Sequence, residues 1–538
     1  MPRLLSMNIS NATTLKPLAR SLFYLLITLL FVGCSATKII NDESPLKITQ
    51  VYEKSSALTE GKKQKWMLTD PILDTLPGIS HSRAIAAVGN KKPNAVVVAI
   101  IDSGVELSHP LIEPSLWVNT DEVADNGIDD DQNGYIDDIH GYNFLGESYY
   151  EQLEYVRMIA GNIGTEKDLA RAKIILEKEL PKATEDKRQY RRIYGLAKTA
   201  IDTLSQLLNT PSFSSADLKN YTPATAYLAQ QKALALQFLT YRDQADALLT
   251  DLKSGVDYYT ERADYNLSVD FNGRAEVSDN PYDISDLRYG NSQVNPRKIE
   301  ESHGTHVAGI VAQIAPFAKL MVLRTVPAGD EYDKDVALAI RYAVDNGAKI
   351  INCSFGKSFS PNKEWVEEAL VYAEKKGVLI VHAAGNESED LDVLKNTNYP
   401  DDEPGGSTEL VTNFISVGAL SPFMSQALIA DFSNFGKKKV DVFAPGEDIY
   451  SSMPQSAYQY QGGTSMAAPV VSGVAAWIAG YFPKLNGSKI KSILKDSSLR
   501  IPGKAINPAT QDVELFSSFS QTGGIVNLYN ALILAQNQ

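Results

Sequence analysis

The sequence predicts an α/β fold of three layers, with helices on both faces of a mainly parallel sheet, plus an all-α insertion. Continuous apolar runs recur along the chain, and such runs are typical of strands that are buried on both faces. Amphipathic helical patterns separate several of these runs, which is the order that a parallel sheet needs. One long polar stretch rich in helix formers carries no strand signal, and it predicts the insertion.

The first predicted strand is "VVVAIID" at residues 96–102, and the Ser-Gly that follows it indicates a loop. Helices are predicted farther along at residues 334–347 and 363–377, and a glycine stops each of them. Strand-like runs precede and follow these helices. They lie at residues 320–325, 349–356, 378–386 and 414–420.

Residues 149–258 form the predicted insertion. They are rich in helix formers of both charges, and apolar residues recur among them at helical spacing. Such spacing is more typical of helices that pack on one another than of a ligand site. The insertion therefore stands apart from the alternating strands and helices around it.

The N-terminus has the pattern of a secretory signal. Residues 1–20 are basic without acids, residues 21–32 are apolar, and Gly33-Cys34 follows. The apolar run is shorter than the roughly 20 residues of a transmembrane helix. We therefore expect a signal peptide at residues 1–34 and a polar tether at residues 35–65.

Gly33-Cys34 resembles a bacterial lipobox, in which the cysteine is lipidated and becomes the new N-terminus. Phe31 stands where that motif usually has leucine, and the alternative is ordinary secretory cleavage nearby. The lipobox predicts a membrane-anchored bacterial lipoprotein outside the cytoplasm, in the outer membrane or periplasm. Several acyl chains would give a stable anchor, since one chain binds only marginally.

Charge and cysteine content exclude other classes. The 538 residues carry a net charge of −14 and no block of lysine or arginine, so nucleic acid is not an expected partner. The chain has two cysteines, and lipidation of Cys34 would leave only Cys353. No internal disulfide framework is therefore expected.

Three glycine-flanked segments carry residues that can do chemistry. They are "IDSGVELSHP" around Asp102, "HGTHVAGI" around His303 and "GGTSMAAP" around Ser465. An aspartate, a histidine and a serine are what acyl transfer needs. The carboxylate orients the imidazole, and the imidazole takes the hydroxyl proton so that the serine oxygen can attack a carbonyl carbon.

The order Asp, His, Ser along the chain is informative, because unrelated folds with this triad use different orders. With these motifs, the chain resembles the subtilisin-like serine proteases (subtilases) from about residue 78 to residue 538, apart from the insertion. The resemblance implies a subtilisin-like αβα sandwich and a peptidase domain at residues 66–538. It also implies serine endopeptidase activity on polypeptides through an acyl-enzyme intermediate, with no cofactor for catalysis.

The same resemblance assigns roles to single residues. Asp102 is the orienting carboxylate and Ser465 the nucleophile, and His303 rather than His306 is the general base. Asn386, at the end of "HAAGN", is the side-chain donor to the oxyanion, beside the backbone N–H of Ser465. The walls of the substrate pocket are Ser354, Phe355 and Gly356 on one side and Ala383, Ala384 and Gly385 on the other. Small and apolar walls suggest a preference for uncharged side chains.

The acidic segment "NGIDDDQNGYIDD" at residues 126–138 suggests a structural calcium site. Its spacing follows the first nine positions of a calcium loop. The twelfth position is His140 instead of glutamate, so another residue, such as Asp138, would have to complete the shell. The alternative is an acidic, solvated turn. The candidate ligands are Asp129, Asp131, Asn133, the Tyr135 carbonyl and Asp137.

Two functions fit this sequence. One is a lipid-anchored serine endopeptidase outside the cytoplasm, and the complete set of Asp102, His303, Ser465 and Asn386 favours it. The other is a non-catalytic binding protein on a subtilase scaffold, with the helical insertion as its working surface. The insertion itself has two interpretations, a lid that restricts substrates or a solvated helical appendage.

Overall fold

The structure is a computed structural model that describes residues 39–40, 44–50, 58–403, 406 and 408–538. The expected signal peptide, with Cys34, and part of the expected tether lie outside these residues. Among the helices of the described residues, none is long and apolar enough to span a bilayer.

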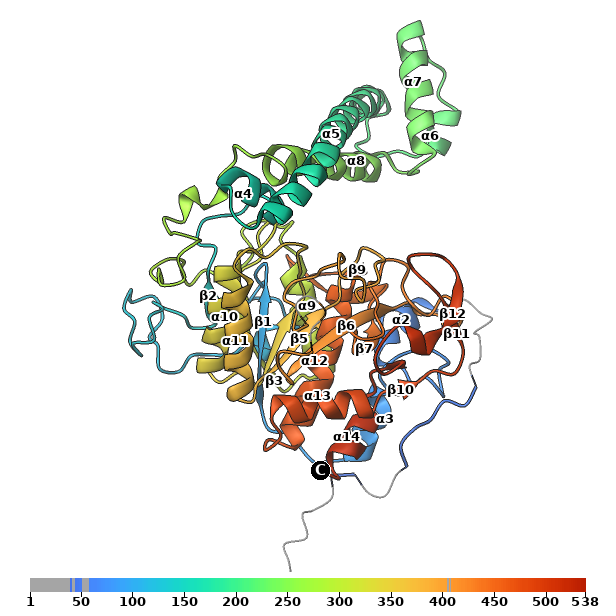
Figure 1. The fold of residues 1–538 in the computed structure, drawn as a ribbon. Coiled ribbons are helices and arrows are strands. Elements are labelled where there is room, and N and C mark those ends of the chain that lie inside the picture. Colours follow the sequence, from blue (N-terminus) through green and yellow to red (C-terminus); the bar gives the residue numbers. More distant parts are fainter. Residues whose placement is uncertain (1–38, 41–43, 51–57, 404–405, 407) are drawn as a thin grey trace, which may run out of the picture.

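A nine-stranded sheet forms the centre of the molecule, in the order β10-β13-β7-β6-β5-β4-β1-β3-β2 (Figure 1). Neighbouring strands pair in parallel except β10 and β13 at one edge. The strands are β1 (Val96–Asp102), β2 (Gly141–Asn143), β3 (Ala318–Arg324), β4 (Ile350–Cys353), β5 (Leu379–Ala383), β6 (Phe414–Leu420), β7 (Val442–Pro445), β10 (Leu499–Arg500) and β13 (Gly524–Ile525). Two hairpins lie outside it, β8 (Ile449–Met453) with β9 (Ala457–Gln461), and β11 (Lys504–Ile506) with β12 (Val513–Leu515).

Helices cover both faces of this sheet. On one face lie α3 (His81–Val88), α9 (His303–Ile314), α12 (Thr464–Tyr481), α13 (Gly487–Asp496) and α14 (Leu528–Ala535). On the other lie α10 (Asp333–Asp345) and α11 (Lys363–Lys375). Short helical turns complete the chain: α2 (Glu60–Lys63), η1 (Trp66–Leu68), η2 (Glu113–Ser115), η4 (Gly273–Glu276) and η6 (Phe516–Ser518).

Strand β1 shows why both faces must be covered. Val98 and Ile100 are buried in the core beneath α9 and α12, whereas Ala99 and Ile101 are buried in the core beneath α10 and α11. Successive side chains of a strand point to opposite faces, so a continuous apolar run needs a helical layer on each side. The structure thus confirms the predicted three-layer α/β fold with a mainly parallel sheet.

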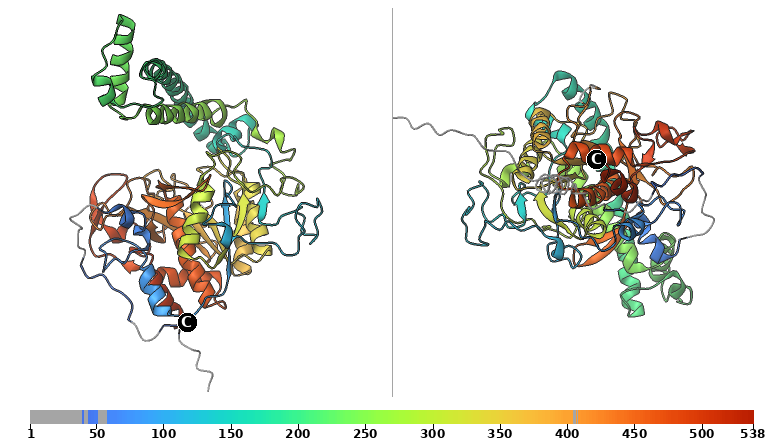
Figure 2. Two further views of the ribbon diagram at one scale, coloured as in Figure 1. Left: turned by 180° about the vertical axis from the view of Figure 1, so that it is seen from behind. Right: turned by 90° about the horizontal axis from the view of Figure 1, so that it is seen from below.

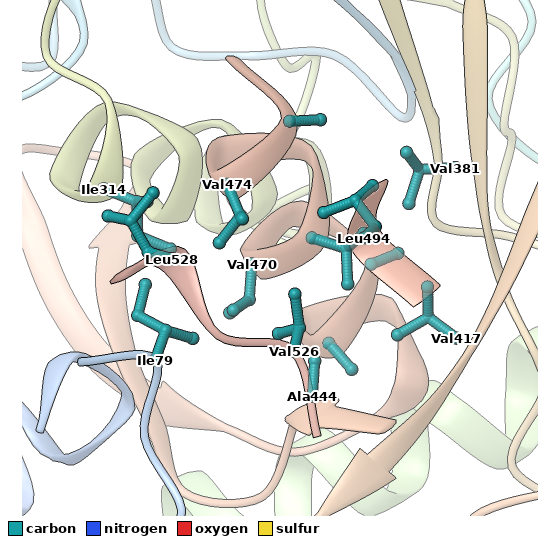
Figure 3. Close-up of a cluster of buried hydrophobic side chains, with 14 of the residues drawn as sticks. Ile79, Ile314, Val381, Val417, Ala444, Val470, Val474, Leu494, Val526 and Leu528 are labelled. Carbon is teal, nitrogen blue, oxygen red and sulfur yellow. The ribbon is translucent and has the colours of Figure 1, made fainter. Parts of the chain in front are cut away.

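Helix α12 passes through the middle of the larger core. Val470 and Val474 of this helix lie among apolar side chains from several strands and helices (Figure 3). Small residues let neighbours approach closely: a Cβ on Gly473 would lie 2.7 Å from the Ile314 side chain at the end of α9. This packing fixes the positions of α9 and α12 relative to each other.

The insertion is all-α, as predicted, and rises from the body as an arm (Figures 1 and 2). It consists of α4 (Glu154–Gly161), α5 (Glu166–Leu208), α6 (Ser215–Lys219), α7 (Ala226–Leu239), α8 (Ala245–Glu261) and the π-helix η3 (Arg262–Asn266). The arm and the C-terminal helix α14 lie at opposite ends of the molecule (Figure 1).

Part of the expected tether packs on the body of the protein. Ile40 is buried in the larger core, and the backbone N–H of Leu46 donates to the side chain of Asn530 on α14 at 2.7 Å. The carbonyl of Leu46 accepts from the same asparagine at 3.1 Å. Residues 45–49 therefore lie against the end of the molecule that is remote from the arm (Figure 1).

Candidate active site

Asp102 and His303 meet at the carboxyl-terminal edge of the sheet. Asp102 is the last residue of β1, and His303 is the first residue of α9. Their Oδ1 and Nδ1 atoms lie 2.7 Å apart. Close approach depends on Gly304, because a Cβ there would lie 2.3 Å from the Gly104 carbonyl oxygen. Open α/β sheets bind ligands at this edge.

The environment of this pair favours a charged imidazole. The Asp102 side chain is 1% exposed, whereas that of His303 is 38% exposed. Burial alone would lower the pKa of His303, but the charge of Asp102 and its hydrogen bond raise it, and the net pKa lies above its usual value. His303 is therefore a proton acceptor whose side chain stays partly accessible to a ligand.

Arg324, the last residue of β3, supports the segments that carry Asp102 and His303. It is fully buried, its Nε donates to the Ser103 carbonyl at 3.0 Å, and it forms an ion pair with Glu301. The loop after Asp102 is thereby tied to the segment just before His303. No local motif pointed to this arginine in the sequence.

Ser465 lies in the first turn of α12 and contacts the first predicted wall of the substrate pocket. Its hydroxyl donates to the Ser354 carbonyl at 3.0 Å, and the Ser354 hydroxyl donates to the Ser465 carbonyl at 2.8 Å. That carbonyl is free for the second bond because Pro469, four residues on, has no N–H to continue the helical ladder. The proline thus helps to fix Ser465 against the wall.

Asn386 is fixed by the residue before Ser465. Its Oδ1 accepts from the backbone N–H of Thr464 at 2.8 Å and from the Thr464 hydroxyl at 3.1 Å. The same hydroxyl accepts from the Gly385 N–H at 3.0 Å. Because the carboxamide oxygen is held, the Nδ2 group is the end of Asn386 that can donate to a ligand.

The two predicted walls end neighbouring parallel strands. Ser354–Gly356 follow β4, and Ala383–Gly385 close β5. Asn398, which the sequence analysis missed, joins them: its Nδ2 donates to the Ala383 carbonyl at 2.9 Å, and its Oδ1 lies 2.1 Å from where a Gly356 Cβ would be. An asparagine in a loop gives no signal of such a contact.

The other histidines of these segments have structural roles. Burial lowers the pKa of His306 to about 4, and its Nε2 lies 3.1 Å from the carbonyl oxygens of Ile449 and Gln459. Burial likewise lowers the pKa of His382 to about 4, and its Nε2 lies 2.9 Å from the Phe355 carbonyl. Carbonyls only accept, so each neutral ring donates from Nε2. His382 is a support of the first wall that sequence reasoning missed.

The acidic loop brings together only part of the predicted metal set. Oxygens of Asp129, Asp131 and Glu122 lie within 4.8 Å of one another. Glu122, which precedes the motif, was missed. Asn133 turns its Nδ2 toward Asp131 at 3.0 Å, and the Asp137 carboxylate accepts from two backbone N–H groups, both at 3.0 Å.

Asp138, the residue suggested to complete the shell, is engaged elsewhere. Its carboxylate accepts from Asn119 at 2.8 Å, from Asn133 at 2.9 Å and from the Tyr342 hydroxyl at 2.5 Å. Asp138 is fully buried, and these three donors replace the hydrogen bonds that its carboxylate would make to water. Tyr135 donates its backbone N–H to Asn133 at 2.8 Å, and its ring packs on Tyr142 and Tyr342.

Comparison with known proteins identifies the family. The model of the subtilase family, peptidase family S8, matches residues 93–521, which include Asp102, His303, Asn386 and Ser465. The chain belongs to the subtilase family. The match spans most of the sequence of this subtilase, including the insertion.

The subtilase is similar to serine proteases of different lengths. It is 33% identical over 263 residues to a thermophilic serine proteinase of Bacillus sp. (strain AK1), a match that covers 47% of this chain and 56% of the relative. It is 34% identical over 214 residues to thermitase of Thermoactinomyces vulgaris, covering 37% and 68%. For a cell wall-associated protease of Bacillus subtilis (strain 168) the identity is 32% over 309 residues, covering 55% and 29%.

The subtilase thus spans about half of the first relative and under a third of the cell wall-associated protease. Among solved structures, a cold adapted subtilisin-like serine proteinase is 26% identical, and the match covers 44% of this chain and 77% of that chain with a TM-score of 0.34.

Proposed function

We propose that this subtilase is a serine endopeptidase that cuts polypeptides through an acyl-enzyme intermediate. The hydrogen bond of 2.7 Å between Asp102 and His303 is the observation that carries the proposal. Nδ1 of His303 donates to the carboxylate, so the neutral ring presents Nε2 as a base. Nε2 takes the hydroxyl proton of Ser465 while its oxygen attacks the carbonyl carbon, and then gives that proton to the leaving amine.

The substrate pocket proposed for this reaction lies between Ser354–Gly356 and Ala383–Gly385. Backbone groups at such an edge can pair with an extended peptide, which gives binding without strict sequence preference. The small and apolar walls support a preference for an uncharged side chain before the cut. No cofactor enters the proposed reaction.

The experiment that tests the activity is incubation of the purified, folded chain with denatured casein at neutral pH. We expect internal cleavage of casein, seen by mass spectrometry as peptides that have lost both native termini. If the folded chain bound casein but left it intact, the alternative of a non-catalytic binding protein would replace this proposal.

Replacing Asn386 with leucine is expected to lower kcat by about 10²–10³-fold and to change KM little. This magnitude is the one known for an oxyanion-hole asparagine in subtilisin, a member of the same family. The Nδ2 group would donate to the oxyanion, which exists only in the tetrahedral intermediate, so ground-state binding does not depend on it. Steady-state kinetics on a peptide substrate measures the split, and an unchanged kcat would refute the role.

Lipid anchoring outside the cytoplasm is a further part of the proposal, and the N-terminal pattern with Gly33-Cys34 supports it. We expect Cys34 to be the lipid-modified first residue of the mature protein. Mass spectrometry of the membrane fraction tests this, with Cys34→Ser as the variant that should leave that fraction. A mature chain with unmodified Cys34 would contradict the anchor.

We also propose a structural calcium ion at Asp129, Asp131 and Glu122. Three carboxylates with oxygens within 4.8 Å of one another suit a hard cation that prefers oxygen ligands. An ion bound only by the folded state stabilises it by about 2.7 kcal/mol at a concentration 100 times Kd. The ion would hold the loop and take no part in the reaction.

Removing calcium with EGTA is therefore expected to lower the Tm of the wild-type protein by several degrees. The double variant Asp129→Asn with Asp131→Asn should have a low Tm that no longer responds to calcium. Asp121→Asn is the matched control, because Asp121 is an exposed acid of the same region outside the carboxylate group. A wild-type Tm that is the same with and without EGTA would refute the site.

A further inference from the structure

The base of the helical insertion is joined to the first wall of the proposed pocket by buried charges. Glu154 and Arg157 of α4 are each 2% exposed, and Arg157 Nη2 lies 2.6 Å from Glu154 Oε2. Lys357 Nζ lies 2.6 Å from the same Glu154 oxygen, and its side chain is also 2% exposed. Lys357 directly follows Gly356, the last residue of the wall.

Lys357 and Arg157 also contact the start of α10 and the residues just before it. Lys357 Nζ lies 2.8 Å from Asp333 Oδ1 and donates to the Glu331 carbonyl at 2.8 Å. Arg157 donates to the Asp330 carbonyl at 2.7 Å and to the Glu331 carbonyl at 2.9 Å. Removing one member of such a buried network would leave an uncompensated buried charge, which is strongly destabilising. The network therefore ties α4, Lys357 and the start of α10 together.

Apolar packing repeats this connection two residues later. Phe359 is buried in a cluster at the base of the insertion, with Tyr155, Val156 and Met158 of α4. The guanidinium of Arg171 on α5 lies 4.4 Å from the centre of the Phe359 ring. Lys357 and Phe359, on the chain that continues from the wall, are therefore both buried against the insertion.

Backbone pairing makes a third connection. The Ala328 N–H donates to the Tyr149 carbonyl at 2.8 Å, and the Glu151 N–H donates to the Ala328 carbonyl at 3.0 Å. Asn266, at the end of the insertion, donates to the carbonyls of both Glu151 and Ala328 at 3.0 Å. Both ends of the insertion are thus fastened to the loop that follows β3.

The outer part of the arm has a core of its own. It shares no residue with the cluster at the base, so the two parts of the insertion are packed separately. The outer cluster consists of Ala200, Ile201, Leu204, Phe213, Leu218, Ala235, Leu239, Ala245 and Leu248. Of these two parts, the base is the one whose Glu154 forms the buried ion pair with Lys357, the residue after the wall.

We propose that Glu154 and Arg157, through Lys357, are positioning residues that hold the Ser354–Gly356 wall in the geometry that binds substrate. The inference rests on the proposed peptidase function. It makes the base of the insertion a support of the substrate pocket and gives the outer arm no such role. Deleting the whole insertion would take Glu154 away from Lys357 and leave it with Asp333 and the Glu331 carbonyl, so the lid hypothesis has to be tested with the base intact.

The test uses Glu154→Gln, which keeps the size of a side chain that lies in the insertion and touches no substrate. We expect KM for a short peptide to rise about tenfold, since small displacements of positioning groups have large effects. The rate at which a small fluorophosphonate labels Ser465 should stay within about twofold of wild type, because the reacting groups are unchanged. Glu154→Asp, which keeps the charge, should recover part of the loss.

Two controls separate this effect from general damage. Glu185→Gln removes a carboxylate of the same kind from an exposed ion pair with Arg188 on the arm, and it should leave both constants unchanged. Replacing residues 195–254 with a short glycine-serine linker removes the outer core and keeps the base, and it should also leave KM unchanged.

An unchanged KM in folded Glu154→Gln would overturn the inference, as would an equal loss of labelling, which would indicate collapse of the whole site. If Glu154→Gln does not fold, Lys357→Arg gives the second measurement. It keeps the charge but alters the contact, so KM should rise and labelling should persist. Failure of the wild-type chain to be labelled would instead refute the proposed peptidase function.

Discussion

Replacing Ser465 with alanine is expected to lower kcat on a peptide substrate by about 10⁶-fold, the magnitude known for loss of the nucleophile in subtilisin, a member of the same family. The Ser465 oxygen would form the covalent bond of the acyl-enzyme, and no other group takes that part in the proposed reaction. Oxyanion donors and substrate binding remain in the variant, which leaves about 10³–10⁴-fold acceleration over water.

The fold is expected to survive this substitution, because alanine fits the first turn of α12 and the Ser465 carbonyl can still accept from Ser354. Ser492→Ala on α13 is the matched control, since Ser492 is exposed and its hydroxyl bonds only within its own helix at 3.1 Å. Active-site titration beside steady-state kinetics measures the loss. Substantial activity in Ser465→Ala would show that another residue is the nucleophile.

Asp102→Asn is expected to lower kcat by about 10⁴-fold while the fold is retained. The carboxylate accepts from Nδ1 of His303 at 2.7 Å and from the Ser103 N–H at 2.8 Å through the same oxygen. An amide can instead donate to Nδ1, which places the ring proton on Nε2 and blocks its use as a base. A variant with nearly normal kcat would contradict the orienting role of Asp102.

The pH dependence of kcat/KM gives a second measurement on the same pair. Asp102 raises the pKa of His303 above its usual value, so the wild-type activity should fall, as pH decreases, at a pH above that of an ordinary histidine. The neutral amide of Asp102→Asn removes the charge that stabilises the imidazolium. Its acid limb should therefore move to lower pH, and an unmoved limb would mean that another group controls the profile.

Much of the fold could be predicted because its signals are local. The run at residues 96–102 is apolar at every position, and in the structure it is a central strand buried on both faces. Glycine-flanked motifs also named Asp102 and His303, which are hydrogen-bonded here. The insertion could be recognised by its helix formers and its lack of strand-like runs.

The residues that were missed make contacts between segments far apart in the sequence. Asn398 joins the two walls, Arg324 ties the loop after Asp102 to the segment before His303, and Glu122 lies beside the acidic loop. The sequence around each of these three residues shows no periodicity and no motif that would indicate its contact. Glu154 and Lys357 lie far apart in the sequence, where each resembles an ordinary surface charge. The fold buries them together as an ion pair.

The central claim is that Ser465 is a nucleophile activated by His303, and its most direct test is mass spectrometry of the folded chain after fluorophosphonate treatment. We predict one adduct, located on the peptide that contains Ser465, and its absence in His303→Ala and in protein unfolded before treatment. A folded wild-type chain that carries no adduct on Ser465 would contradict the account.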